Sequence, residues 1–314
     1  MSAFTPGSVS LRLYPHLELA APQIVEELRT QASLAAEHGF DGVMTSEHHG
    51  GFAGYLPNPL QLAGWLLEAM PRGWAAPCPL LLPLRPAALV AEETAWLAAR
   101  FPERVGLGVA AGALPADFEI MGVPMENLAD RFAEGLELVT QALRGAPLSA
   151  LSGDAALARC REHPVPVVSA ANSATAVRRA AAAGAGVLFD SLSPPERCRQ
   201  LSDAYRDSGG TGPRVLIRRA WVGPPPADLV ERQVDVYRSY APAAAQARWD
   251  ADQLVTGADA DAVAAELGRV VARAGADSLN LRVHVPGVSV DAAREQIVLL
   301  GSCGIRFDAD VHDR

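Results

Sequence analysis

The stretch AAGAGVLF at residues 182–189 decides the fold of this 314-residue chain. It joins an alanine-rich helix to a strand through a glycine, which is the usual return connection of a strand–helix unit. The same junction recurs as EHGFDGVM at 37–44 and as RAGADSLNL at 273–281. A connection repeated in this way predicts a parallel sheet whose strands alternate with helices.

Eight apolar runs predict the strands, at 9–14, 42–46, 78–84, 104–110, 166–170, 186–190, 214–222 and 278–285. Helical patterns follow at about 22–39, 59–70, 87–99, 128–143, 173–183, 260–274 and 290–300, and another begins near 195. Eight such units predict a (β/α)8 TIM barrel. A doubly wound open sheet is the alternative, but it is disfavoured by the lack of a GxGxxG turn.

We expect one barrel domain over residues 1–314, because no low-complexity linker divides the chain. Two long connections, near 111–127 and 145–165, are expected to be insertions. In a barrel of this kind the active site is built at the C-terminal ends of the strands. The residues that follow each predicted strand are therefore the candidates for function.

The composition excludes several classes of protein. Hydrophobic residues make up 49% of the chain and the formal charge is −9, which argues against a disordered chain and against binding to nucleic acid or an anionic membrane surface. The chain has no lysine, so a lysine Schiff base and a Walker A loop are both excluded. Any phosphate would have to be bound by arginine, hydroxyl groups or backbone N–H groups.

The four cysteines form no CxxC pair, and a chain of this length does not need disulfides. The first ten residues show neither a basic segment nor a long apolar run, so no signal peptide is expected. No stretch reaches the length of a membrane span. We expect a cytoplasmic protein.

Three ionisable residues, Glu47, His48 and His49, end the second predicted strand. Successive strand residues point to opposite sides, so the three are not expected to share one pocket, and no metal site is predicted. A histidine here suits acid–base work or hydrogen bonding to a bound ring. The alternative is a set of polar side chains satisfied at a strand end.

The fifth predicted strand runs directly into a helix through Asn172, Ser173 and Thr175. These residues form either an anion cradle or an ordinary helix cap. The fourth strand carries Gly106 and Gly108, and Gly112 follows it, which leaves room for a flat ligand or for tight packing of the barrel.

Three segments carry a resemblance to a known family: TSEHHGGFAGYLPNP (45–59), LLLPLRPAALVAEETAWLAARFPERVGLGVAAGALPADFEIMG (80–122) and PVPVVSAANSATAVRRAAAAG (164–184). Together they resemble the luciferase-like monooxygenases, which are flavin- or deazaflavin-dependent (β/α)8-barrel enzymes. The resemblance covers roughly the first 190 residues. It implies a bacterial luciferase-like TIM barrel.

The resemblance implies catalytic roles for four residues. His48 matches the family's catalytic histidine near the reactive edge of the flavin, and Glu47 and His49 complete the motif. Asp117 matches the aspartate of the family's DF pair, which follows the fourth strand.

The resemblance also implies the cofactor site. Cys78-Pro79 matches a cis peptide beside the flavin ring, and Ser173 and Thr175 match hydroxyls that hold its phosphate. With the neighbouring positions and one possible substitute, the cofactor-binding candidates are Cys78, Pro79, Ala110, Gly112, Asn172, Ser173, Thr175 and Arg218.

One position departs from the family pattern. Relatives of bacterial luciferase carry a phosphate-binding arginine where this chain has Ala111. Arg218 or Arg219 could replace it, or reduced FMN could bind weakly as a diffusing cosubstrate, or the barrel could have lost flavin.

The resemblance therefore implies an enzyme that uses reduced FMN and dioxygen to oxidise a small organic substrate, with a separate flavin reductase and a homodimeric assembly. The alternatives are a deazaflavin-dependent hydride-transfer enzyme and a catalytically silent barrel that supports a partner subunit.

Overall fold

The strands form one parallel sheet that closes into a barrel. The computed structural model describes residues 2–52, 54–148, 151–240, 246, 253–305 and 307. Neighbouring strands follow the order β3-β2-β1-β10-β8-β7-β6-β5-β4, and a bridge between Ala75 and Val105 joins β3 to the segment before β5. The predicted TIM barrel is thus confirmed. The strands are β1 (Val9–Arg12), β2 (Gly42–Thr45), β3 (Trp74–Pro77), β4 (Leu80–Leu81), β5 (Leu107–Ala110), β6 (Val167–Ala170), β7 (Gly186–Phe189), β8 (Arg214–Val222), β9 (Leu254–Gly257) and β10 (Ser278–Arg282).

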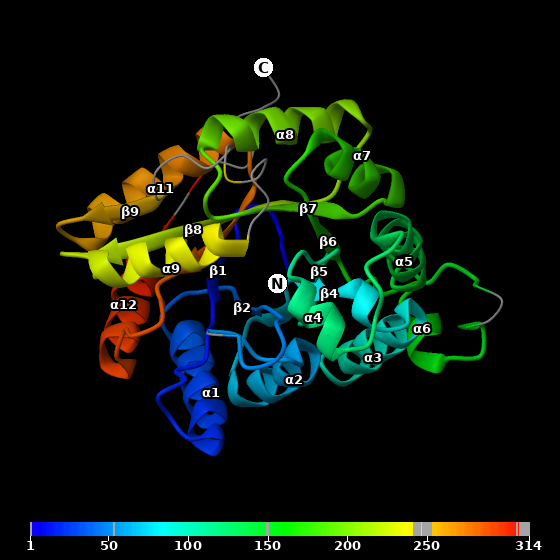
Figure 1. Cartoon of the computed structure of the whole chain (residues 1–314), viewed down its shortest axis with the longest axis horizontal. Coiled ribbons are helices and arrows are strands. Elements are labelled where there is room, and N and C mark those ends of the chain that lie inside the picture. Colours follow the sequence, from blue (N-terminus) through cyan, green and yellow to red (C-terminus); the bar gives the residue numbers. More distant parts are fainter. Residues whose placement is uncertain are drawn as a thin grey trace.

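Helices surround the strands (Figure 1). Those in the strand connections are α1 (Ala21–Glu37), α2 (Pro59–Ala69), α3 (Ala87–Arg100), α5 (Leu128–Ala142), α7 (Ala174–Ala183), α8 (Pro195–Asp207), α9 (Ala227–Tyr240), α11 (Ala260–Ala274) and α12 (Val290–Ser302). The two predicted insertions contain short helices, α4 (Pro115–Ile120) and α6 (Ala155–Arg159). None of the helices in the described part of the chain is long and apolar enough to cross a bilayer.

The third barrel strand differs from the prediction. It begins earlier, at Trp74, and is interrupted at Cys78-Pro79, after which only β4 pairs with β5. Residues Leu82–Leu84, which were expected to continue the strand, form a 3-10 turn. The reason is the spacing of Pro77, Pro79 and Pro83, because proline has no N–H to donate to a neighbouring strand. The Cys78-Pro79 peptide is cis, as predicted.

The strand glycines serve the packing of the barrel interior. A Cβ atom on Gly108 would lie 2.1 Å from Sγ of Cys78, and one on Gly42 would lie 2.2 Å from the ring of Trp74. Likewise, a Cβ atom on Gly106 would collide with Ala3 and Phe4 at 2.7–2.9 Å. These positions therefore leave room for protein side chains, which supports the packing interpretation of Gly106 and Gly108.

Candidate active site

A cavity of about 320 Å³ lies at the end of the barrel where the strands finish. Its wall combines apolar side chains with a few charged and phenolic ones. The lining residues are Arg12, Tyr14, Ser46, Glu47, His48, Tyr55, Pro79, Leu81, Ala113, Asn172, Asp190, Ser191, Leu192, Ile217, Tyr237 and Arg282. Such a cavity at the C-terminal end of the strands is the expected place for an active site.

His48 and Asp117 form a hydrogen-bonded pair at the wall of this cavity. The Nδ1–H group of His48 donates to Oδ2 of Asp117 over 2.7 Å, and the backbone N–H of His49 donates to Oδ1 over 2.8 Å. Burial alone would raise the pKa of Asp117, but the hydrogen bonds from His48 and His49 lower it below its ordinary value. An ionised Asp117 fixes the Nδ1–H tautomer, so the other ring nitrogen of His48 can accept a proton.

Aromatic rings hold the His48 imidazole from two sides. Its centroid lies 4.7 Å from that of Phe52 and 4.5 Å from that of Tyr55. The His48 side chain keeps 17% exposure, whereas that of Asp117 has 1%. The histidine therefore meets the cavity while its carboxylate partner stays behind it.

Glu47 and His49 form a hydrogen-bonded pair with each other. Nε2 of His49 lies 3.0 Å from Oε1 of Glu47, and the backbone N–H of Leu81 donates to Oε2 of Glu47 over 2.6 Å. Arg85 also pairs with the Glu47 carboxylate. Burial raises the pKa of Glu47 although Arg85, the Leu81 N–H and His49 oppose the shift. This carboxylate holds β2, β4 and the segment after β4 together.

The other cofactor candidates divide into two groups. Pro79 and Asn172 line the cavity, but Ala110 and Gly112 do not, and Ala113 takes their place. Gly112 has a positive φ of 82°, and a Cβ atom there would lie 2.9 Å from the ring of Phe118. It is therefore required by the chain turn toward α4.

Cys78 lies behind the cavity wall and is fully buried. Burial raises the pKa of its thiol to about 12, although the nearby Arg12 opposes the shift. A thiol of this kind is not a nucleophile at neutral pH. Cys78 therefore contributes its backbone, whose carbonyl accepts a hydrogen bond from Arg12 over 2.8 Å.

At the start of α7, Ser173 is an ordinary N-cap. Its Oγ atom accepts a hydrogen bond from the backbone N–H of Ala176 over 3.2 Å. Thr175 is exposed. The helix-cap interpretation of Ser173 is therefore confirmed, while Thr175 retains a hydroxyl that faces solvent at the same helix end.

The structure does not bring Arg218 to the cavity. Its guanidinium lies outside the barrel sheet, where it donates to the carbonyls of Ser193 over 2.7 Å and Asp190 over 3.2 Å. Its neighbour Arg219 is also buried, and its Nη2 atom lies 3.4 Å from Oε1 of Gln233. Neither residue is among those that line the cavity.

The arginines and tyrosines of the cavity wall were missed in the sequence: Arg12, Tyr14, Tyr55, Tyr237 and Arg282. A signal existed for the arginines, because each is the charged residue of an otherwise buried strand. No local pattern marks Tyr237, which comes from α9 and reaches the cavity only through the tertiary fold.

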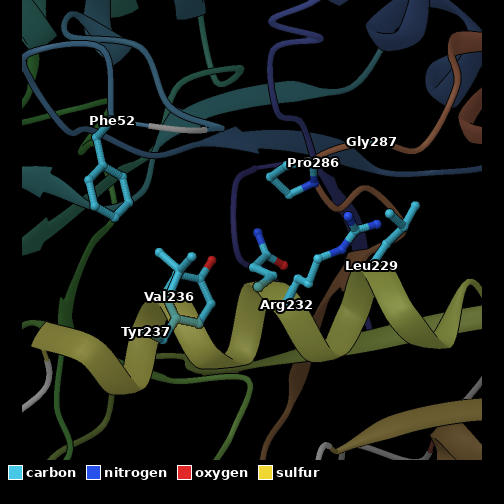
Figure 2. A pocket seen from close by; sticks show the side chains of 8 residues that line it. Phe52, Leu229, Arg232, Val236, Tyr237, Pro286 and Gly287 are labelled. Carbon is cyan, nitrogen blue, oxygen red and sulfur yellow. The ribbon is translucent and has the colours of Figure 1, made fainter.

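A second, largely apolar pocket of about 260 Å³ lies beside the cavity and shares Tyr237 with it. Figure 2 shows Phe52 across this pocket from the side chains of α9, with Pro286 and Gly287 at its edge. Because Phe52 also packs on His48, the two hollows are neighbours on one face of the barrel. Within the part of the chain that is described, no three His, Cys, Asp or Glu residues gather as metal ligands.

The family model of the luciferase-like monooxygenases matches residues 8–301, which include every strand of the barrel and the whole cavity. The chain belongs to the luciferase-like monooxygenase family. A relative from Mycobacterium tuberculosis (strain H37Rv), whose function is uncharacterised, is 33% identical over 143 residues. That match covers 43% of this chain and 49% of the relative, so the chain matches about half the length of this curated protein.

Solved structures share the fold at low identity. The oxygenating constituent of 3,6-diketocamphane monooxygenase from Pseudomonas putida, in complex with FMN, has a TM-score of 0.77 at 18% identity. The alignment covers 95% of this chain and 98% of that one. An F420-dependent secondary alcohol dehydrogenase has a TM-score of 0.68 at 17% identity, with 94% and 99% covered. These likenesses establish the barrel fold.

Proposed function

We propose that this luciferase-like monooxygenase uses reduced FMN and dioxygen to oxidise a small organic substrate in the cavity beside His48. The pair of His48 and Asp117 carries the proposal. It supports the proposal because one ring nitrogen of His48 is held by a carboxylate, which leaves the other for proton transfer at the wall of a mostly apolar cavity. A reduced flavin bound there supplies electrons to dioxygen.

The cavity fits the ring of a flavin better than it fits the phosphate. Pro79, Leu81 and Ile217 offer apolar surface for a flat ring, and Asn172 offers an amide for its polar edge. Among the described residues, the phosphate side offers Thr175 and the N–H groups at the start of α7, because Ser173 caps the helix and Ala111 bears no charge. We therefore expect a cofactor that binds through its ring and is held weakly.

Weak binding favours a diffusing cosubstrate over a resident cofactor. The chain would receive reduced FMN from a separate reductase and release it oxidised. During turnover, His48 would move a proton between the substrate and water, and Asp117 would stabilise the imidazolium that forms. The aromatic rings of Phe52 and Tyr55 keep the imidazole oriented and limit its contact with solvent.

The test is an anaerobic titration, read by tryptophan fluorescence, with reduced FMN, oxidised FMN and a reduced deazaflavin coenzyme. The proposal predicts saturable binding of reduced FMN in the micromolar range and weaker binding of the other two. Preference for the deazaflavin would replace the proposal with the hydride-transfer alternative. No binding of any of the three would instead indicate a silent barrel.

A further inference from the structure

Two buried arginines lie side by side in the wall of the same cavity that His48 lines. Arg12 of β1 and Arg282 of β10 are register partners, and each is 3% exposed. Neither forms an ion pair with a carboxylate in the described part of the chain. Burying a cation without a counter-charge is costly. Such a pair therefore favours an anion in the adjoining cavity.

The hydrogen bonds of the two guanidinium groups go to neutral acceptors. Arg12 donates to Oδ1 of Asn280 over 2.7 Å and to the carbonyl of Cys78 over 2.8 Å. Arg282 donates to the Tyr237 hydroxyl over 2.8 Å and to a carbonyl, and its Nη2 atom has no hydrogen-bond acceptor in the described structure. A buried N–H group of a cation that lacks an acceptor calls for a ligand oxygen or a water molecule.

The carboxylates of the cavity wall do not compensate this charge. Glu47 is bound by Arg85, His49 and the Leu81 N–H. Asp190 turns its Oδ1 atom toward backbone N–H groups, those of Leu192 at 2.9 Å and Ser193 at 2.7 Å. In the described part of the chain, neither acid forms an ion pair with Arg12 or Arg282.

The positive charge of the two arginines affects the tyrosine side chains around Arg282. The Arg282 guanidinium carbon lies 4.3 Å from the centroid of the Tyr14 ring. Burial would raise the pKa of Tyr14, but Arg282 and Arg12, together with Tyr55, bring it below its ordinary value. Tyr237 and Tyr55 share a hydrogen bond of 2.9 Å between their hydroxyls, so hydroxyl groups stand next to the cation.

We propose that Arg282, supported by Arg12 and the Tyr237 hydroxyl, binds the carboxylate of a substrate whose apolar body occupies the rest of the cavity. The unpartnered Nη2 amino group of Arg282 beside a hydroxyl matches the two oxygens of a carboxylate, and Leu81 and Ile217 provide apolar surface in the same wall. This inference rests on the proposed function, because it names the substrate class of the same site.

The test compares benzoate with its neutral isostere benzamide by isothermal titration calorimetry, using the wild-type protein with and without FMN. Benzoate should bind about 10- to 100-fold more tightly, the worth of a charge-assisted hydrogen bond. Arg282→Gln should abolish the preference. Arg232→Gln is the matched control, because Arg232 is an exposed arginine in the neighbouring pocket of Figure 2 and should leave the preference unchanged.

Equal affinities for benzoate and benzamide in the wild-type protein would overturn the inference without any variant, so it does not depend on whether Arg282→Gln folds. A preference that survives in folded Arg282→Gln would also overturn it. Competitive displacement of benzoate by FMN would assign the arginines to the flavin ring instead. If benzoate is preferred through Arg282 but reduced FMN does not bind, the proposed function fails and the carboxylate site stands.

Discussion

His48 at the end of β2 is held by Asp117 of α4 through a 2.7 Å hydrogen bond between residues 69 positions apart. The second carboxylate oxygen of Asp117 accepts the backbone N–H of His49, so one buried acid fixes both the imidazole and the chain that carries it. The insertion after β5 is therefore part of the site. It determines which nitrogen of His48 is hydrogen-bonded to a carboxylate.

Replacing His48 tests the acid–base role. His48→Ala should lower the rate of product formation by about 10²–10⁴, the usual loss for a general acid or base. Reduced-FMN affinity should stay within a few-fold. The measurement is a reductase-coupled assay on a substrate found by mass-spectrometric screening.

The neighbouring variant His49→Ala is its control. Because His49 hydrogen-bonds the buried Glu47, this change should cost about 1–3 kcal/mol of stability and little turnover. Turnover lost at His49 and retained at His48 would reverse the assignment of the two histidines.

An arginine introduced at position 111 should supply the positive charge that this chain lacks there. Ala111→Arg should tighten the binding of FMN by roughly 1.5–3 kcal/mol, the value of a hydrogen bond to a charged group. Riboflavin, which has no phosphate, should respond little. An equal gain for both ligands in fluorescence titrations would show that this position does not face the phosphate.

Removing the hydroxyl of Ser173 and removing that of Thr175 should have different effects on stability and FMN binding. Ser173→Ala removes a helix cap and should lower stability by about 1 kcal/mol, seen as a lower Tm without ligand. Thr175→Ala should leave the Tm unchanged but weaken the binding of FMN relative to riboflavin. If Thr175→Ala binds FMN as tightly as the wild type does, the Thr175 hydroxyl does not contact the phosphate.

Acid should destabilise the protein partly through His284. Burial lowers its pKa to about 3, and the nearby His16 and Arg282 add to the shift. The unfolded chain, with an ordinary histidine pKa of about 6.5, binds more protons between these values, so stability falls as the pH drops through that window. His284→Phe keeps a ring against Tyr14 and His16.

The wild-type protein should lose about 2 kcal/mol more stability between pH 7 and pH 5 than His284→Phe does. Urea unfolding at both pH values measures this difference. His163→Phe, at an exposed histidine, is the control and should change nothing. An unaltered pH dependence in His284→Phe would mean that this histidine is not held neutral in the folded protein.

The repeated glycine junctions were enough to predict the barrel, and the elements with clear ends were predicted best. β8 and α11 have the predicted bounds, because an apolar run and a helix between Asp259 and Gly275 leave little ambiguity. The predicted bounds of the third strand were wrong because prolines at alternate positions obscure where it begins and interrupt its pairing. The position of His48 was predictable as a strand end, but its partner Asp117 was implied only by family resemblance.

The arginine side of the cavity was not predictable from local pattern. Arg12 and Arg282 become neighbours through the pairing of β1 with β10, which joins opposite ends of the chain. Tyr237 reaches them from α9, a helix whose amphipathic sequence gives no sign of which barrel end it covers. Conversely, Arg218 was expected at the site, and the alternation of side chains along β8 sends it to the outer face.

The most direct test of the central claim is stopped-flow absorbance of reduced FMN mixed with dioxygen at increasing protein concentration. We predict that the re-oxidation rate departs from that of free FMN, saturates with protein, and changes again in His48→Ala. Re-oxidation identical to that of free FMN at every protein concentration would contradict a flavin site beside His48.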